Sequence, residues 1–144
     1  LAVSPYCFIN ITLILKTMKV TITTCKKYSY YLLPILWMGV IYLFSAQSTL
    51  PGSEVLLVDF IYIKTGHIVF YMVLFWSWFT ALKANQLKVT SWQIWGLIFL
   101  LCISYAMFDE YHQSLVPGRS GRWRDVGIDT LGCYLAFLYT YKLI

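Results

Sequence analysis

Residues 92–113 read WQIWGLIFLLCISYAMF followed directly by DEYHQ. The first part, residues 92–108, carries no charged side chain, whereas the second part combines acidic, imidazole and amide groups. A helix needs roughly 17–25 apolar residues to cross a bilayer, and ionisable groups at the edge of the hydrocarbon are costly unless they have partners. The stretch therefore predicts a transmembrane helix that ends in a polar functional site.

The composition of the whole chain points to the same class of protein. Of its 144 residues, 60% are hydrophobic and only 12% are charged, whereas a soluble domain carries about 25% charged residues. The net charge is +5, but the lysines flank apolar runs and form no basic stripe with interleaved aromatic residues. This pattern disfavours nucleic-acid binding and favours a membrane protein without a nucleic-acid partner.

Three further apolar runs resemble the first in length, so the chain has four candidate spans, at residues 30–46, 61–82, 92–108 and 126–141. Helices with almost no polar face cannot form the surface of a soluble protein. We therefore predict an all-α fold, an integral membrane bundle of four transmembrane helices.

The N-terminal region differs from these runs. Its apolar patch at residues 8–15 is too short to span and contains Asn10 and Thr12. The sequence begins with Leu1, and Met18 is a candidate for the true start. We expect residues 1–28 to be an N-terminal extension and residues 29–144 to form the membrane domain.

Basic residues in short loops indicate the orientation, because they are enriched on the cytoplasmic side. If the chain crosses four times, most lysines fall on one side, which places both termini in the cytoplasm. These lysines are Lys16, Lys19, Lys26, Lys27, Lys83, Lys88 and Lys142. The loop with Arg119, Arg122 and Arg124 must then face outward, and we interpret its arginines as held in a site beside acidic residues.

With this topology, polar side chains from all four spans gather at the outer end of the bundle. The predicted ligand-binding residues are Gln47, Lys64, His67, Asp109, Glu110, His112, Gln113, Arg119, Arg124, Asp125 and Asp129. Helical spacing places Lys64, His67 and Tyr71 on one face. Asp125 and Asp129 lie one turn apart and repel each other unless Lys64, an arginine or a shared proton intervenes.

Two glycine-containing motifs predict close approach of backbone segments. Pro117-Gly118 marks a turn, and Gly121 adds freedom, so the loop can fold back and bring Arg119 near Asp109 or near a lipid headgroup. The alternative is an exposed basic loop that touches phospholipids nonspecifically. Gly132 and Ala136 form a small-xxx-small pair, which favours tight packing of the fourth span within the bundle.

No cofactor or metal is predicted. The cysteines, Cys7, Cys25, Cys102 and Cys133, lack metal-ligand spacing and are interpreted as buried free thiols. His67, Asp109, Glu110 and His112 could in principle hold a metal, but their spacing matches no known ligand pattern. The sequence also lacks a phosphate-binding glycine loop and a serine nucleophile elbow.

Three sequence blocks resemble the VanZ-like family of small bacterial membrane proteins, which is named for a member linked to teicoplanin resistance. They are FSAQS at 44–48, the pattern Lys64-x-x-His67-x-x-x-Tyr71, and DEYHQ at 109–113 together with VPGR at 116–119, Asp125-Val126, Asp129-Thr130 and Gly132. The chain departs from the family pattern in several places. It has Ile63 where an acid often precedes the lysine, Ala46 between the serines of the first block, Asp129 where asparagine is frequent and Ala136 where glycine is frequent.

The resemblance implies a multi-pass protein of the bacterial inner membrane, and three functions stay open. The first is binding of an amphiphile, a membrane lipid or a lipid-linked cell-wall precursor, at the outer leaflet, with a contribution to teicoplanin-type glycopeptide resistance. The second is an enzyme that uses Asp109, Glu110 and His112 for acid–base chemistry on a lipid-linked substrate. The third is a structural or proton-linked accessory protein, in which the polar cluster only holds the helices together.

Overall fold

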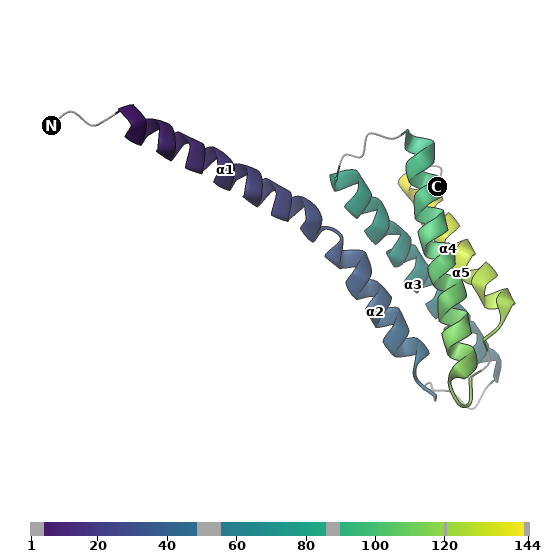
Figure 1. Ribbon diagram of the computed structural model, residues 1–144. Helices are drawn as coiled ribbons and strands as arrows, with labels where there is room; N and C mark the ends of the chain where they lie inside the picture. The colour runs from purple at the N-terminus through teal and green to yellow at the C-terminus, as the bar shows by residue number, and fades with distance from the viewer. Residues whose placement is uncertain (1–4, 49–55, 86–89, 120, 143–144) are drawn as a thin grey trace.

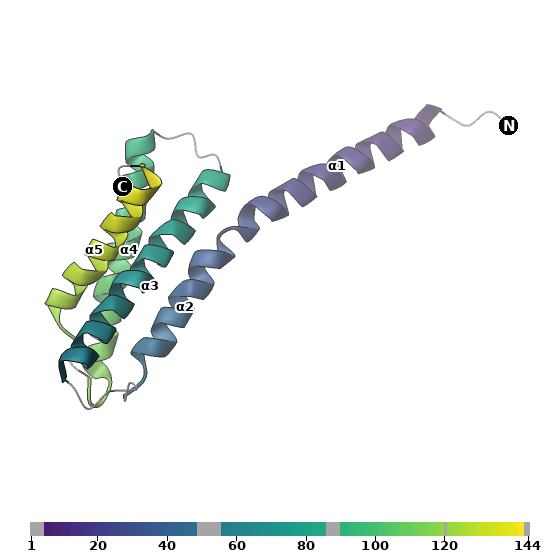
Figure 2. The ribbon, with the colours of Figure 1, turned by 180° about the vertical axis from the view of Figure 1, so that it is seen from behind.

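The computed structural model describes residues 5–48, 56–85, 90–119 and 121–142, and these form five helices and no strand. The helices are α1 (Pro5–Ser29), α2 (Leu32–Ser45), α3 (Leu56–Ala84), α4 (Ser91–Leu115) and α5 (Trp123–Thr140). The bundle consists of α2 to α5, and α1 extends beyond it (Figures 1 and 2). The all-α prediction is confirmed, and α2 to α5 correspond to the four predicted spans.

Three segments are long and apolar enough to cross a membrane, namely Leu15–Ser45, Phe60–Ala84 and Trp92–Leu115. Large apolar side chains cover the outside of the bundle, among them Leu36, Leu43 and Leu100, each more than 60% exposed. Such a surface is unfavourable in water. These features agree with the predicted membrane class.

The fourth predicted span, α5, is not among these three segments. It has 18 residues, and three of them are charged, Arg124, Asp125 and Asp129. Asp125 and Asp129 are both buried against the other helices. The acidic side chains of α5 therefore point into the bundle.

The N-terminal region forms a helix of its own, α1. A turn at residues 30–31 separates it from α2, and the backbone N–H of Tyr31 donates to the carbonyl of Tyr28 at 3.1 Å. Pro34 lies in the first turn of α2, where a backbone N–H has no partner within the helix. The side chain of Asn85, which follows α3, donates to the carbonyl of Lys27 at 3.0 Å and ties the end of α1 to the bundle.

The core lies between α3, α4 and α5. At the end of the bundle where α3 finishes and α4 starts, Trp95 stacks on Phe79 with 4.9 Å between ring centroids and meets Phe137 edge-on at 5.0 Å. Further along, Tyr71 and Leu74 are fully buried. Stacked rings around Trp95 thus fill this end of the bundle.

The predicted tight packing at Gly132 is confirmed. A Cβ added there would collide with the carbonyl oxygen of Ile68 on α3. Ala136, one turn later, is also buried. The two small residues let the backbones of α3 and α5 approach closely, which brings their polar side chains within bonding distance.

The cysteine prediction is only partly right. Cys102 and Cys133 are free and buried as expected, but Cys25 is exposed. It lies on α1, which extends beyond the bundle and has little to be buried against. The side chain of Cys7 lies outside the described residues.

Candidate functional site

A series of polar contacts joins α3 to α5. Lys64 Nζ lies 2.6 Å from Asp125 Oδ1, and His67 Nδ1 lies 2.8 Å from Asp129 Oδ1. One turn further on, the thiol of Cys133 donates weakly to the carbonyl of Tyr71 at 3.8 Å. The contacts follow the helical repeat on both helices, because the two helices run in the same direction. We call these pairs the α3–α5 ladder.

The α3–α5 ladder explains how Asp125 and Asp129 can lie one turn apart on α5. Each carboxylate has its own partner on α3, Lys64 for Asp125 and His67 for Asp129. Of the alternatives considered, the structure selects the lysine. Lys64 thus has an acidic partner on another helix, although Ile63 precedes it.

A second group of contacts joins α4 to α2 through Gln113. Its Nε2 donates to Asp109 Oδ2 at 2.9 Å and to Ser45 Oγ at 3.0 Å. Its Oε1 accepts a hydrogen bond from Arg119 Nη2 at 3.1 Å. Asp109 and Gln113 share a face because they are four residues apart on α4. Arg119 therefore reaches the neighbourhood of Asp109 through one intervening amide.

The loop between α4 and α5 folds back on the bundle as expected. Gly118 adopts a φ of 81°, which favours glycine, and the Arg119 N–H donates to the Val116 carbonyl at 3.1 Å. At Gly121, an added Cβ would collide with the backbone carbonyl of Glu110. The Glu110 carboxylate in turn accepts from the backbone N–H of Arg122 at 2.7 Å and fixes the start of α5.

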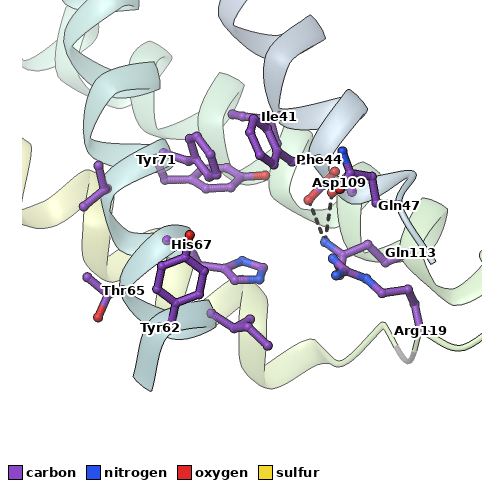
Figure 3. A pocket seen from close by; sticks show the side chains of 15 residues that line it. Ile41, Phe44, Gln47, Tyr62, Thr65, His67, Tyr71, Asp109, Gln113 and Arg119 are labelled. Carbon is purple, nitrogen blue, oxygen red and sulfur yellow. Dashed lines mark hydrogen bonds between the residues drawn. The ribbon is translucent and has the colours of Figure 1, made fainter. Parts of the chain in front are cut away.

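A cavity of about 440 Å³ opens between α2, α3 and the end of α4. Its walls are mostly apolar, and its polar lining includes residues from both groups of contacts. Figure 3 shows His67 and Arg119 projecting into it from opposite sides, with Asp109 and Gln113 between α2 and the loop. The lining is Ile41, Phe44, Ser45, Gln47, Tyr62, Ile63, Thr65, Gly66, His67, Val69, Phe70, Tyr71, Asp109, Gln113 and Arg119.

Four carboxyl groups are buried around this cavity. Asp109, Glu110, Asp125 and Asp129 are each at most 5% exposed. Among the described residues, no hydrogen bond reaches Asp109 Oδ1, Glu110 Oε1 or Asp129 Oδ2. His67, Glu110 and Asp129 each place a possible metal-ligand atom within 4.8 Å of the others. They come from α3, α4 and α5, so linear spacing could not reveal the grouping.

Comparison with known proteins identifies the family. The family model described as VanZ/LLP1 matches residues 6–144. The chain belongs to the VanZ/LLP1 family. No curated protein and no solved structure gave a match.

Within this VanZ-family chain, some predicted site residues lie away from the cavity. The ring of His112 packs on Tyr42, with 4.4 Å between ring centroids, and does not line the cavity. Arg124 is exposed, and Glu110 lies behind the cavity wall, bonded to the loop. Their part in ligand binding stays a prediction.

Other residues of this VanZ-family site were not among the predicted ones. Ser45 bonds to Gln113, and Tyr71 and Tyr62 line the cavity. Ser45 and Tyr71 both fall in sequence blocks that carry the family resemblance, so those blocks held a signal for them. Tyr62 lies outside the blocks, and nothing in the sequence pattern marks it.

Proposed function

We propose that this VanZ-family protein binds an amphiphile with an anionic headgroup in the cavity between α2, α3 and α4. The observation that carries the proposal is the mixed lining of that cavity. Apolar side chains such as Ile41, Phe44 and Phe70 form most of the wall, and Arg119 lies at the polar end. Its volume of about 440 Å³ lies within the range of roughly 300–1,000 Å³ typical of small-molecule sites.

Arg119 suits an anionic headgroup because its planar guanidinium carries several N–H donors that match phosphate or carboxylate. Gln113 accepts a hydrogen bond from Nη2 and orients the group. The same glutamine lies between the guanidinium and the Asp109 carboxylate, so Arg119 is not consumed by a direct ion pair with that acid in the described structure. The guanidinium thus keeps capacity for a ligand.

The lysine distribution and the family support the proposed biological setting. Lysines around the ends opposite the cavity favour a cytoplasmic location for those ends. The cavity then faces the outer leaflet of the bacterial inner membrane, where lipids and lipid-linked cell-wall precursors present their headgroups. Capture of such a molecule is a route to reduced sensitivity towards teicoplanin-type glycopeptides.

The test is native mass spectrometry and lipid analysis of the protein purified in mild detergent. We expect an anionic lipid to co-purify with the wild type and to be depleted at least several-fold in Arg119→Ala. The matched control is Arg124→Ala, which removes an exposed arginine that does not line the cavity. Equal lipid content in all three proteins, or loss in the control alone, refutes the proposal.

A second candidate is acid–base chemistry on the bound headgroup. It is favoured by one observation: His67 lines the cavity and its Nδ1 bonds to the buried Asp129 carboxylate, which would orient the ring. This places His67 with Asp109 in the cavity, whereas His112 lies outside it. Turnover of a radiolabelled lipid-linked phosphate by the wild type, abolished in His67→Gln and Asp109→Asn, would support it. Turnover no faster than in membranes lacking the protein would eliminate it.

A further inference from the structure

Three helices bring one nitrogen ligand and two carboxylates to a common point. His67 comes from α3, Glu110 from α4 and Asp129 from α5, and one possible ligand atom of each lies within 4.8 Å of the other two. Each pair of these residues is separated by at least 19 positions in the sequence. The grouping therefore arises from tertiary packing and not from the periodicity of a single helix.

In each of the two acids of this group, one carboxylate oxygen has a hydrogen-bond partner and the other has none among the described residues. Glu110 is 4% exposed; its Oε2 accepts from the Arg122 N–H, while Oε1 has no hydrogen-bond partner among the described residues. Asp129 is fully buried; its Oδ1 bonds to His67, while Oδ2 has no such partner there. A buried acceptor without a partner costs free energy. These two buried oxygens are therefore available as ligands for a cation.

The balance of charges around His67, Glu110 and Asp129 also favours a bound cation. Four carboxyl groups are buried in this region, and in the described part of the chain two cationic side chains bond to the network, Lys64 to Asp125 and Arg119 to Gln113. If all four acids are ionised and His67 is neutral, two negative charges remain without compensation. A divalent cation would neutralise them.

We propose that His67, Glu110 and Asp129 form a binding site for one divalent transition-metal ion. An imidazole nitrogen with two carboxylate oxygens suits Zn²⁺ or Mn²⁺, whereas Ca²⁺ takes about 6–8 oxygen ligands. Three protein ligands leave a coordination position for water or a ligand. Because His67 also lines the cavity, the site lies at the cavity wall. The proposal goes beyond amphiphile binding and does not depend on it.

Metal binding can be measured on the full chain in detergent after removal of metal with a chelator. We expect the wild type to take up about one Zn²⁺ or Mn²⁺ per chain by calorimetry and elemental analysis, and to discriminate against Ca²⁺. Replacement of a ligand, in Glu110→Gln or Asp129→Asn, is expected to weaken binding by about 10-fold or more. His112→Gln is the matched control, because His112 is the second of two histidines and packs on Tyr42 outside the group.

Two further measurements separate a metal site from a structural role of the same residues. Glu110→Gln keeps a side-chain acceptor for the Arg122 N–H, so its fold can be retained, and metal should raise the melting temperature of the wild type but not of this variant. X-ray absorption of the Zn²⁺-loaded wild type should show one imidazole and oxygen ligands, which requires no variant.

The proposal is overturned if the wild type binds no stoichiometric metal, if the absorption spectrum shows no imidazole, or if both ligand variants bind as tightly as the wild type. These experiments contain no added lipid. Failure here leaves amphiphile binding through Arg119 standing, and failure of lipid co-purification leaves the metal site standing.

Discussion

Gln113 is the single residue that links most parts of the polar site. Its amide donates to Ser45 on α2 and to Asp109 on α4, and it accepts from Arg119 in the loop. Only a side chain with both donor and acceptor ends can satisfy an acid and a guanidinium together. Because Gln113 is 5% exposed, water cannot replace these bonds easily.

Substitution Gln113→Leu should therefore reduce the stability of the bundle. The leucine has a similar volume but leaves Asp109 and Arg119 without their shared partner, at a cost of about 1–3 kcal/mol. Chemical unfolding in detergent micelles measures this change. Ser114→Ala serves as the control, since Ser114 is exposed and bonds only within α4, and it should stay within about 0.5 kcal/mol of the wild type. Equal stability of the two variants would contradict the assigned role.

The residues of the site could be predicted from the sequence only as far as helical spacing reaches. The shared face of Lys64 and His67 was predicted, because it depends on one helix alone. The partners across helices were open: Lys64, an arginine or a shared proton could each have relieved the repulsion between Asp125 and Asp129. The approach of Glu110 to His67 had no linear signature. Such pairings depend on the rotation of each helix about its axis, which the sequence pattern leaves undetermined.

At the scale of whole elements, a close approach of α3 and α5 positions the site. A Cβ at Gly132 would meet the Ile68 carbonyl, whereas a Cβ at Gly127, on the same helix, meets nothing within 4 Å. The α3–α5 ladder depends on this approach, because Lys64 and His67 must reach Asp125 and Asp129. The close packing of α3 and α5 therefore requires a glycine at position 132 but not at position 127.

The substitutions Gly132→Ala and Gly127→Ala form a matched pair. Both gain the helix propensity of alanine, about 0.5–1 kcal/mol relative to glycine. Only Gly132→Ala forces α3 and α5 apart, and overpacking of this kind costs about 1–3 kcal/mol. We expect Gly132→Ala to lower the free energy of unfolding in detergent and Gly127→Ala to leave it unchanged or raise it. The reverse order would show that the helices are not in close contact at Gly132.

At the scale of the whole molecule, the two ends of the bundle differ in chemistry. Stacked aromatic rings around Trp95 fill one end, and the buried acids, His67 and Arg119 occupy the other. The sequence predicted the gathering of polar residues at one end and the positions of α2 to α5, because hydropathy and charge position are properties of segments. Only three of the segments are long and apolar enough to cross a membrane, and α5 is not among them. The sequence left the helical character of residues 5–29 open, since that region has neither a long apolar run nor a clear terminus signal.

Cysteine labelling can test the proposed orientation of the two ends. With the four native cysteines replaced, Arg119→Cys should react with a membrane-impermeant maleimide added to intact cells. Lys83→Cys, at the end of α3, should react only after the membrane is permeabilised. The opposite pattern would reverse the orientation, and reaction of both positions in intact cells would contradict a bundle that spans the bilayer.

The α3–α5 ladder also predicts the order in which the helices insert into the membrane. An aspartate in an isolated helix opposes insertion, by about 2.5–3.5 kcal/mol when it lies at the helix centre. α5 carries two aspartates, both in its first two turns. In the folded bundle those carboxylates pair with Lys64 and His67. We therefore expect α5 to enter the bilayer only when α3 is already inserted next to it. Glycosylation mapping should accordingly find α5 integrated in the full chain and excluded when α3 is replaced by a polyleucine helix.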